Sequence, residues 1–185
     1  MVEQDMAEVS YARESLVAAL RDRGISYLAP SDAVAREVFE TNEQLLCALL
    51  HQDDSRLQLA IVPLLLRHPG ISASVPDLAA SLDEVASLDL QTLYMAAVYL
   101  QRNWRSRLSI YLDDMTLLPD LFSHQMGLPP SDEQFGKTGL VELADAWQAR
   151  SQYPFERLQA INNTFELFIG QLKLEKANPS NAPKM

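Results

Sequence analysis

The most distinctive hydrophobic pattern of the chain is the run LQLAIVPLLL, from Leu57 to Leu66, in which Gln58 is the only polar residue. A helix that is apolar on every side has to be buried all round. The run is about half of the ~20 residues that a helix needs to cross a bilayer. It therefore predicts a central core helix over about 57–68, surrounded by other helices, rather than a membrane span.

A proline interrupts this central helix. Pro63 has no N–H to donate to the carbonyl of Leu59, and its ring crowds that same carbonyl. We therefore expect a kink, or a break into two short helices. Asp53 or Asp54 can cap the beginning of the segment, and the sequence His68-Pro69-Gly70 is expected to end it.

A longer helix is predicted from Leu88 to about Leu112, and it carries apolar residues on two sides. One face is defined by residues at three- and four-residue steps: Leu90, Leu93, Ala97, Leu100, Trp104, Leu108 and Tyr111. Met95, Tyr99 and Ile110 project almost opposite that face. A helix with two apolar sides packs either between two layers or against a partner, and the sequence leaves both open.

Helical signals dominate the rest of the chain, because strand-like alternation is scarce. Further helices are predicted over 7–23, from about Leu140 to Arg150, and from Pro154 onward. A short helix is predicted from Pro119 to Met126, with Gly127 ending it. Thr41 and Gln44 have the spacing of a capping box, which marks another helix start.

Two segments are poor in residues that could be buried. The stretch LPPSDEQFGKTG, from Leu128 to Gly139, is rich in turn formers and is predicted to be a mobile loop. The tail 176–185 is predicted to be disordered. The expected fold is thus all-α, a multi-helix globular bundle in a single domain over 1–175, with an armadillo- or HEAT-like helical stack as the variant.

Composition and charge narrow the function classes. Of the 185 residues 48% are hydrophobic, which suffices for a core without disulfides or metal. The chain is acidic: 15 Lys and Arg stand against 25 Asp and Glu, so its charge of -10 repels phosphate backbones and argues against a nucleic-acid partner. The single Cys47 cannot form an internal disulfide, and the acidic N-terminal stretch lacks the apolar region of a secretory signal. We expect a cytoplasmic protein.

Catalytic and metal-binding motifs are missing from the sequence, including HExxH, a phosphate-cradling glycine loop and cysteine pairs with zinc spacing. The best local cluster is His51, Asp53 and Asp54. Cys47 lies one turn before His51, where a thiol nucleophile could touch its base. Helix caps and helix-end positions explain each of these residues separately. We therefore expect no catalytic residue, cofactor or metal, and an enzyme that uses this cluster is an alternative.

The leading hypothesis is a non-enzymatic adaptor or accessory subunit that acts through protein–protein contacts, with a protein partner or with itself. The contact surface would be Met95, Tyr99, Arg102 and Arg105, because apolar residues opposite a core face need cover and Tyr and Arg are enriched where partners bind. An alternative from another class is a small-molecule or lipid pocket inside the bundle, in space left by the bend at Pro63.

One further alternative comes from a resemblance. The stretch DSRLQLAIVPLLLRHP (54–69) and the aromatic last helix resemble small helical accessory proteins that partner nucleotidyltransferases. This resemblance implies that the partner is a nucleotidyltransferase-type module.

Overall fold

The computed structural model describes residues 12–28, 39–113, 115–150 and 156–178. Every regular element within these ranges is a helix or a helical turn, which confirms the predicted all-α fold. None of the helices in these ranges is both long and apolar enough to cross a membrane.

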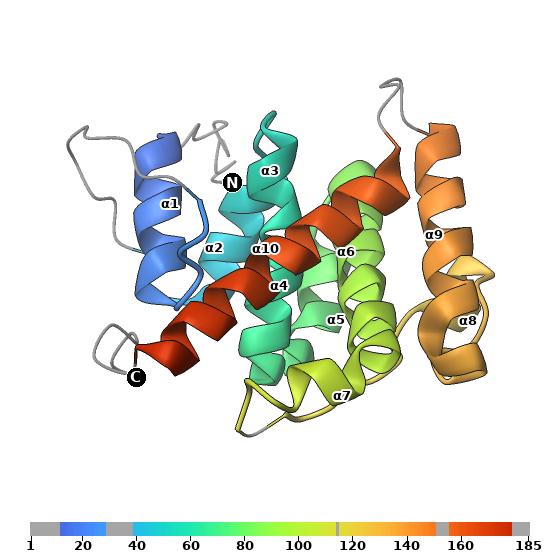
Figure 1. Ribbon diagram of the computed structural model, residues 1–185. Coiled ribbons are helices and arrows are strands. Elements are labelled where there is room, and N and C mark those ends of the chain that lie inside the picture. Colours follow the sequence, from blue (N-terminus) through green and yellow to red (C-terminus); the bar gives the residue numbers. More distant parts are fainter. Residues whose placement is uncertain (1–11, 29–38, 114, 151–155, 179–185) are drawn as a thin grey trace, which may run out of the picture.

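The larger helices form an upright row that one long helix crosses. Figure 1 shows α1 (Arg13–Asp22), α6 (Glu84–Asn103) and α9 (Lys137–Arg150) standing in the row, and α10 (Arg157–Ala177) running diagonally in front of it. The remaining elements are α2 (Asn42–Leu50), α3 (Ser55–Leu59), α4 (Ile61–Arg67), η1 (Pro69–Ala73), α5 (Val75–Ser81), α7 (Arg105–Leu108), α8 (Ser123–Met126) and η2 (Glu133–Gly136).

The predicted central helix is confirmed as a buried segment, and it is broken in two. Every residue from Leu59 to Leu66 is buried. The break falls at Ala60, between α3 and α4, so that Pro63 is the third residue of α4, where a missing N–H costs no intrahelical hydrogen bond. Asp54, rather than Asp53, caps α3, because its Oδ1 accepts a hydrogen bond from a backbone amide of the first turn at 2.9 Å.

The predicted helix from Leu88 to Leu112 is two helices in the structure. It begins earlier because Asp83 caps it, accepting hydrogen bonds from two backbone amides of the first turn of α6. It stops at Trp104, whose φ of -112° separates α6 from α7. With this bend the Trp104 ring stacks on Phe165 of α10, with 5.9 Å between the ring centroids.

Both apolar sides of α6 are covered by other helices of the chain. One side packs against α4 and α5, and another packs against α9 and η2. Met95 and Tyr99 are fully buried as a result, so the two-layer explanation is the one that the structure shows. The approach of α9 is close at Gly139, where an added Cβ would lie 2.2 Å from the Tyr99 ring.

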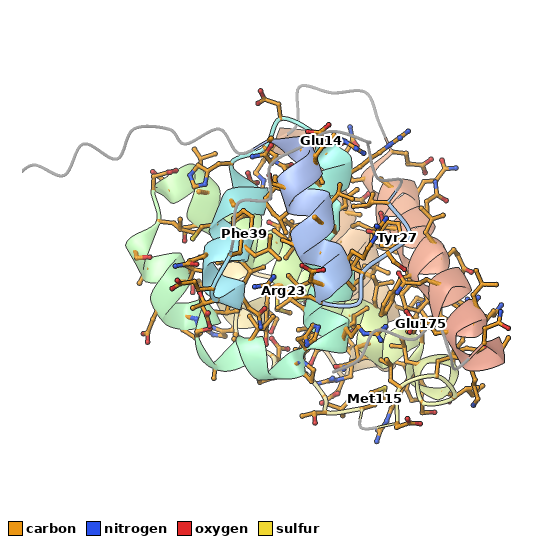
Figure 2. The ribbon with its side chains drawn as sticks, turned by 90° about the vertical axis from the view of Figure 1, so that its left-hand side faces the viewer. Glu14, Arg23, Tyr27, Phe39, Met115 and Glu175 are labelled. Atoms are coloured by element: carbon orange, nitrogen blue, oxygen red, sulfur yellow. The ribbon has the colours of Figure 1, made fainter. Side chains whose placement is uncertain are left out.

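Polar side chains hold the N-terminal part of the described chain in place. Arg23, labelled in Figure 2, donates from Nη2 to the carbonyl of Phe39 at 2.9 Å and from Nε to Asn42 at 2.6 Å. Gln171 of α10 donates to the carbonyl of Gly24 at 2.6 Å, and it accepts from the amide of Ser26. The turn after α1 is thereby fixed against α2 and α10.

Two helices begin later than the sequence predicts. The first helix ends at Asp22, as expected within one residue, but it begins at Arg13, since Ala12 has an extended backbone; the predicted start at Ala7 lies outside the described residues. The last helix, α10, runs from Arg157 to Ala177 after an extended Glu156, and its predicted start at Pro154 also lies outside the described residues. The capping box of Thr41 and Gln44 is confirmed at the start of α2.

Candidate functional site

The two apolar residues of the predicted contact surface are buried in this structure. Met95 and Tyr99 are 0% exposed, beneath α9 and η2. The side chain of Arg102 is only 12% exposed, and Arg105 is exposed. The prediction is therefore corrected: the apolar side of α6 is covered from within the chain, and Met95 and Tyr99 are not accessible to a partner in this conformation.

Tyr99 and Arg102 instead anchor the segment that contains α8. The Tyr99 hydroxyl donates to the carbonyl of Pro129 at 2.6 Å. Arg102 donates from Nη2 to the carbonyl of Leu118 at 2.9 Å and from Nε to Asp132 at 3.1 Å. These bonds reach positions before and after α8, so the segment 118–136, which we call the anchored segment, is held on α6. The expectation of a mobile loop over 128–139 does not fit these contacts.

Asp120 closes the anchored segment on itself. Its Oδ2 accepts from the amide of Ser131 at 2.8 Å, and its Oδ1 accepts from the amide of Ser123 at 3.1 Å. Between these residues α8 ends at Gly127, whose φ of 66° is left-handed, as glycine permits. The predicted stop at Gly127 is thus confirmed.

The Asp120 carboxylate should make this closure depend on pH. Burial raises its pKa, but the hydrogen bonds from Ser123 and Ser131 outweigh burial and hold the pKa below its ordinary value of 3.8. The folded state therefore favours the ionised form, and the stability that it adds is present above the ordinary pKa and is lost as pH falls below it. We expect the Ser131 amide resonance to report this titration below about pH 4.

The variant Asp120→Asn should abolish the pH dependence of the Ser131 resonance, because asparagine has no charge to lose. Asp77→Asn, on α5, is the matched control and should leave it in place. A Ser131 resonance that titrates equally in both variants would contradict the assignment to Asp120.

The end of the anchored segment has an unusual backbone. Gln134 and Phe135 have φ of 45° and 56°, and Gly136 follows with φ of 77°. The left-handed region costs a residue with a Cβ about 1–2 kcal/mol, and aromatic residues seldom adopt it. Gly136 also lies so close to α6 that an added Cβ would be 2.7 Å from the Tyr99 carbonyl oxygen. The close contact and the anchoring bonds therefore fix the turn in its strained conformation.

This strained turn displays an aromatic side chain. Phe135 is 79% exposed, more than any other large hydrophobic residue of the described chain. Exposed acidic residues, Asp132 and Glu133, precede it on the same turn. Burial does not explain a phenylalanine here, and strained positions concentrate at functional sites. A phenylalanine among turn formers was the only signal in the sequence, and it was missed.

His51 and Asp54 of the predicted cluster make structural contacts in this fold. The Nδ1 of His51 lies 2.7 Å from the carbonyl oxygen of Cys47, at the end of α2. Asp54 caps α3 and pairs with Arg13. The Cys47 thiol is half-buried, and burial together with the nearby Glu43 raises its pKa, which opposes thiolate formation. Among the described residues, no group of three His, Cys, Asp or Glu could hold a metal ion.

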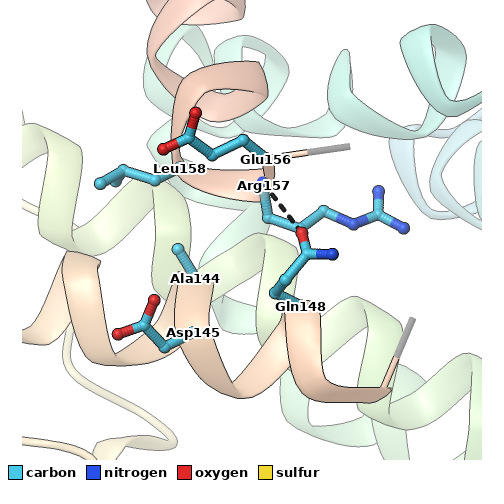
Figure 3. A pocket seen from close by; sticks show the side chains of 6 residues that line it. All are labelled: Ala144, Asp145, Gln148, Glu156, Arg157 and Leu158. Carbon is cyan, nitrogen blue, oxygen red and sulfur yellow. Dashed lines mark hydrogen bonds between the residues drawn. The ribbon is translucent and has the colours of Figure 1, made fainter. Parts of the chain in front are cut away.

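A hollow of about 300 Å³ lies where α9 meets the beginning of α10 (Figure 3). Its lining includes three charged side chains, and the Gln148 side chain there accepts from the Arg157 amide at 3.3 Å. The Arg157 guanidinium also lies over the Trp147 ring, 4.5 Å from its centroid. Pro63 does not line this hollow, and the charged side chains of Asp145, Glu156 and Arg157 do not suit a lipid tail.

The candidate site is therefore the exposed turn around Phe135. Tyr99 and Arg102 were predicted from the sequence as contact residues. In the structure they hold this turn in place through hydrogen bonds from α6. None of the family models, curated proteins or solved structures with which the chain was compared matches it.

Proposed function

We propose that this protein acts through protein–protein contact, and that Phe135 is the anchor residue it inserts into its partner. The observation that carries the proposal is the turn itself: an exposed aromatic on a backbone of high energy, held by bonds from a buried helix. Aromatic anchors dominate the energetics of many interfaces. Because the backbone that presents Phe135 is already fixed, less conformational entropy is lost on binding.

The chemistry around Phe135 indicates what the partner offers. Asp132 has a side chain that is 89% exposed, and Glu133 beside it is exposed too. The whole chain carries a formal charge of -10. Complementary electrostatic fields speed association and select partners. The expected partner therefore has an apolar pocket for Phe135 and a basic rim that faces the acidic residues. The proposed setting is cytoplasmic, in keeping with a chain whose single cysteine forms no internal disulfide.

Phe135→Asn should remove partner binding without loss of stability. Asparagine tolerates the left-handed backbone better than phenylalanine, and little buried surface is lost. We expect the free energy of unfolding to stay equal or to rise by up to about 1 kcal/mol. The measurements are urea unfolding, and affinity capture of the tagged variant and the wild type from their own cells with partners identified by mass spectrometry.

Val85→Ser is the matched control, because Val85 is 71% exposed and lies in the first turn of α6. It should keep the stoichiometric partner that Phe135→Asn loses. A partner retained by both variants, or none captured by the wild type, would overturn the proposal.

A further inference from the structure

The outer face of α10 is a second exposed apolar surface, independent of the turn at Phe135. The inner face packs into the core through Ile161, Phe165, Phe168, Ile169 and Leu172. The helix lies at the front in Figure 1 and at the edge of the molecule in Figure 2, where no described element covers it. On this outer face Leu167 is 55% exposed and Leu174 is 67% exposed.

These leucines belong to a stripe with the spacing of a coiled-coil seam. Leu167, Gly170 and Leu174 are three and four residues apart, and the exposed Asn163 and Ala177 continue the same alternation in both directions. A stripe of this kind is the pattern by which one helix packs along another.

Gly170 is not explained by the packing of the single chain. An added Cβ there would meet nothing within 4 Å, so an alanine would fit. Glycine inside a helix costs roughly 0.5–1 kcal/mol relative to alanine. A bare backbone between two exposed leucines does, however, let a second helix approach closely.

The charges beside the stripe complement one another in a two-fold arrangement. Glu166 precedes Leu167, and Lys173 precedes Leu174. The midpoint of either pair, Glu166 with Lys173 or Leu167 with Leu174, falls within one residue of Gly170. Two antiparallel copies of α10 that cross at Gly170 would therefore set each Glu166 beside Lys173 of the second copy, and each Leu167 beside Leu174 of the second copy. A two-fold interface requires such self-complementarity.

Glu166 is already held in a suitable position. Its carboxylate accepts two hydrogen bonds from the Arg107 guanidinium, one of them at 2.7 Å. The side chain is still 53% exposed, and a carboxylate has further lone pairs to accept from a lysine. The ion pair within the chain and the ion pair between copies are therefore compatible.

We propose that two copies of this chain associate through the outer faces of α10, antiparallel and crossing at Gly170. The contact is a single helix pair, smaller than the interfaces of permanent dimers, so we expect a reversible dimer with a dissociation constant on the order of micromolar. A dimer of this kind would display two Phe135 turns.

Sedimentation equilibrium over a range of protein concentrations tests the association. Gly170→Gln should weaken the dimer at least about tenfold, because a long side chain blocks the crossing point. In the monomer the same side chain projects into open space and glutamine favours helix, so thermal stability should not fall. Val85→Ser, on α6, should leave the dimer unchanged. A wild type that stays monomeric throughout, or a dimer that Gly170→Gln leaves intact, would overturn the proposal.

Disulfide cross-linking tests the orientation. At the crossing point Gly170→Cys should give a cross-linked dimer on mild oxidation, since the two thiols meet on the two-fold axis. Asn163→Cys lies seven residues away on the same stripe, so its two thiols would be about 21 Å apart in the antiparallel pair and should not cross-link. Equal cross-linking by both variants would indicate a parallel pair and contradict the proposed arrangement.

Discussion

Gly139→Ala should lower the free energy of unfolding by about 3 kcal/mol, at the upper end of the range for overpacked sites. The added Cβ would lie 2.2–2.7 Å from three atoms of the Tyr99 ring. That ring cannot move aside, because it is fully buried and its hydroxyl is bonded to Pro129. Alanine offsets part of this cost, because its helix propensity is higher than that of glycine. The measured loss is therefore the cost of the steric clash minus about 1 kcal/mol.

Urea unfolding of the variant and the wild type measures this loss. Gly70→Ala is the control, since its new Cβ would meet nothing within 4 Å, and it should change stability by less than about 0.5 kcal/mol. Equal stability of Gly139→Ala and the wild type would show that α6 and α9 are not in close contact. Partner capture should also weaken in Gly139→Ala, because Tyr99 holds the anchored segment.

Gln101→Leu should destabilise the fold by about 2–4 kcal/mol, as expected when buried polar groups lose their partners. Gln101 is 0% exposed on α6, and its Nε2 donates to the carbonyl of Thr116 at 2.8 Å. Its Oε1 accepts from the buried amide of Leu118 at 2.7 Å. Leucine fills the space and satisfies neither group, so the beginning of the anchored segment should come loose.

Gln91→Leu provides the matched comparison on the same helix. Gln91 is 9% exposed, and within the described ranges its side chain donates to the hydroxyl of Ser87, which can turn to other partners. We expect a change of less than about 1 kcal/mol. Chemical denaturation compares the two variants, and hydrogen exchange at the Leu118 amide locates the effect. A similar loss of stability in both variants would mean that the hydrogen bonds of Gln101 with Thr116 and Leu118 add no stability of their own.

Local signals in the sequence were enough to place several helix ends. The capping box at Thr41, the break caused by Pro63 and the stop at Gly127 all depend on residues within one turn of each other. Such effects are decided by backbone geometry and by the hydrogen bonds of the first and last turns. They do not require knowledge of the rest of the fold.

The layers around α6 could not be derived in the same way. Periodicity showed that Met95 and Tyr99 lie opposite the main apolar face, but it cannot tell whether a partner or another helix covers them. The anchored segment was missed for a related reason. Tyr99 and Arg102 bond to backbone carbonyls, and every residue has one, so the sequence gives no sign of which carbonyl is chosen.

The break at Ala60 has a consequence for the order of folding. The two pieces that it creates, α3 and α4, contain 5 and 7 residues, whereas α6 and α10 contain 20 and 21. Isolated helices shorter than ~12–15 residues are marginal in water, so the nucleation cost weighs heavily on α3 and α4. This buried part of the chain is therefore poorly able to form alone. We expect it to become helical only when α6 and α10 enclose it, so that the centre of this protein is completed late.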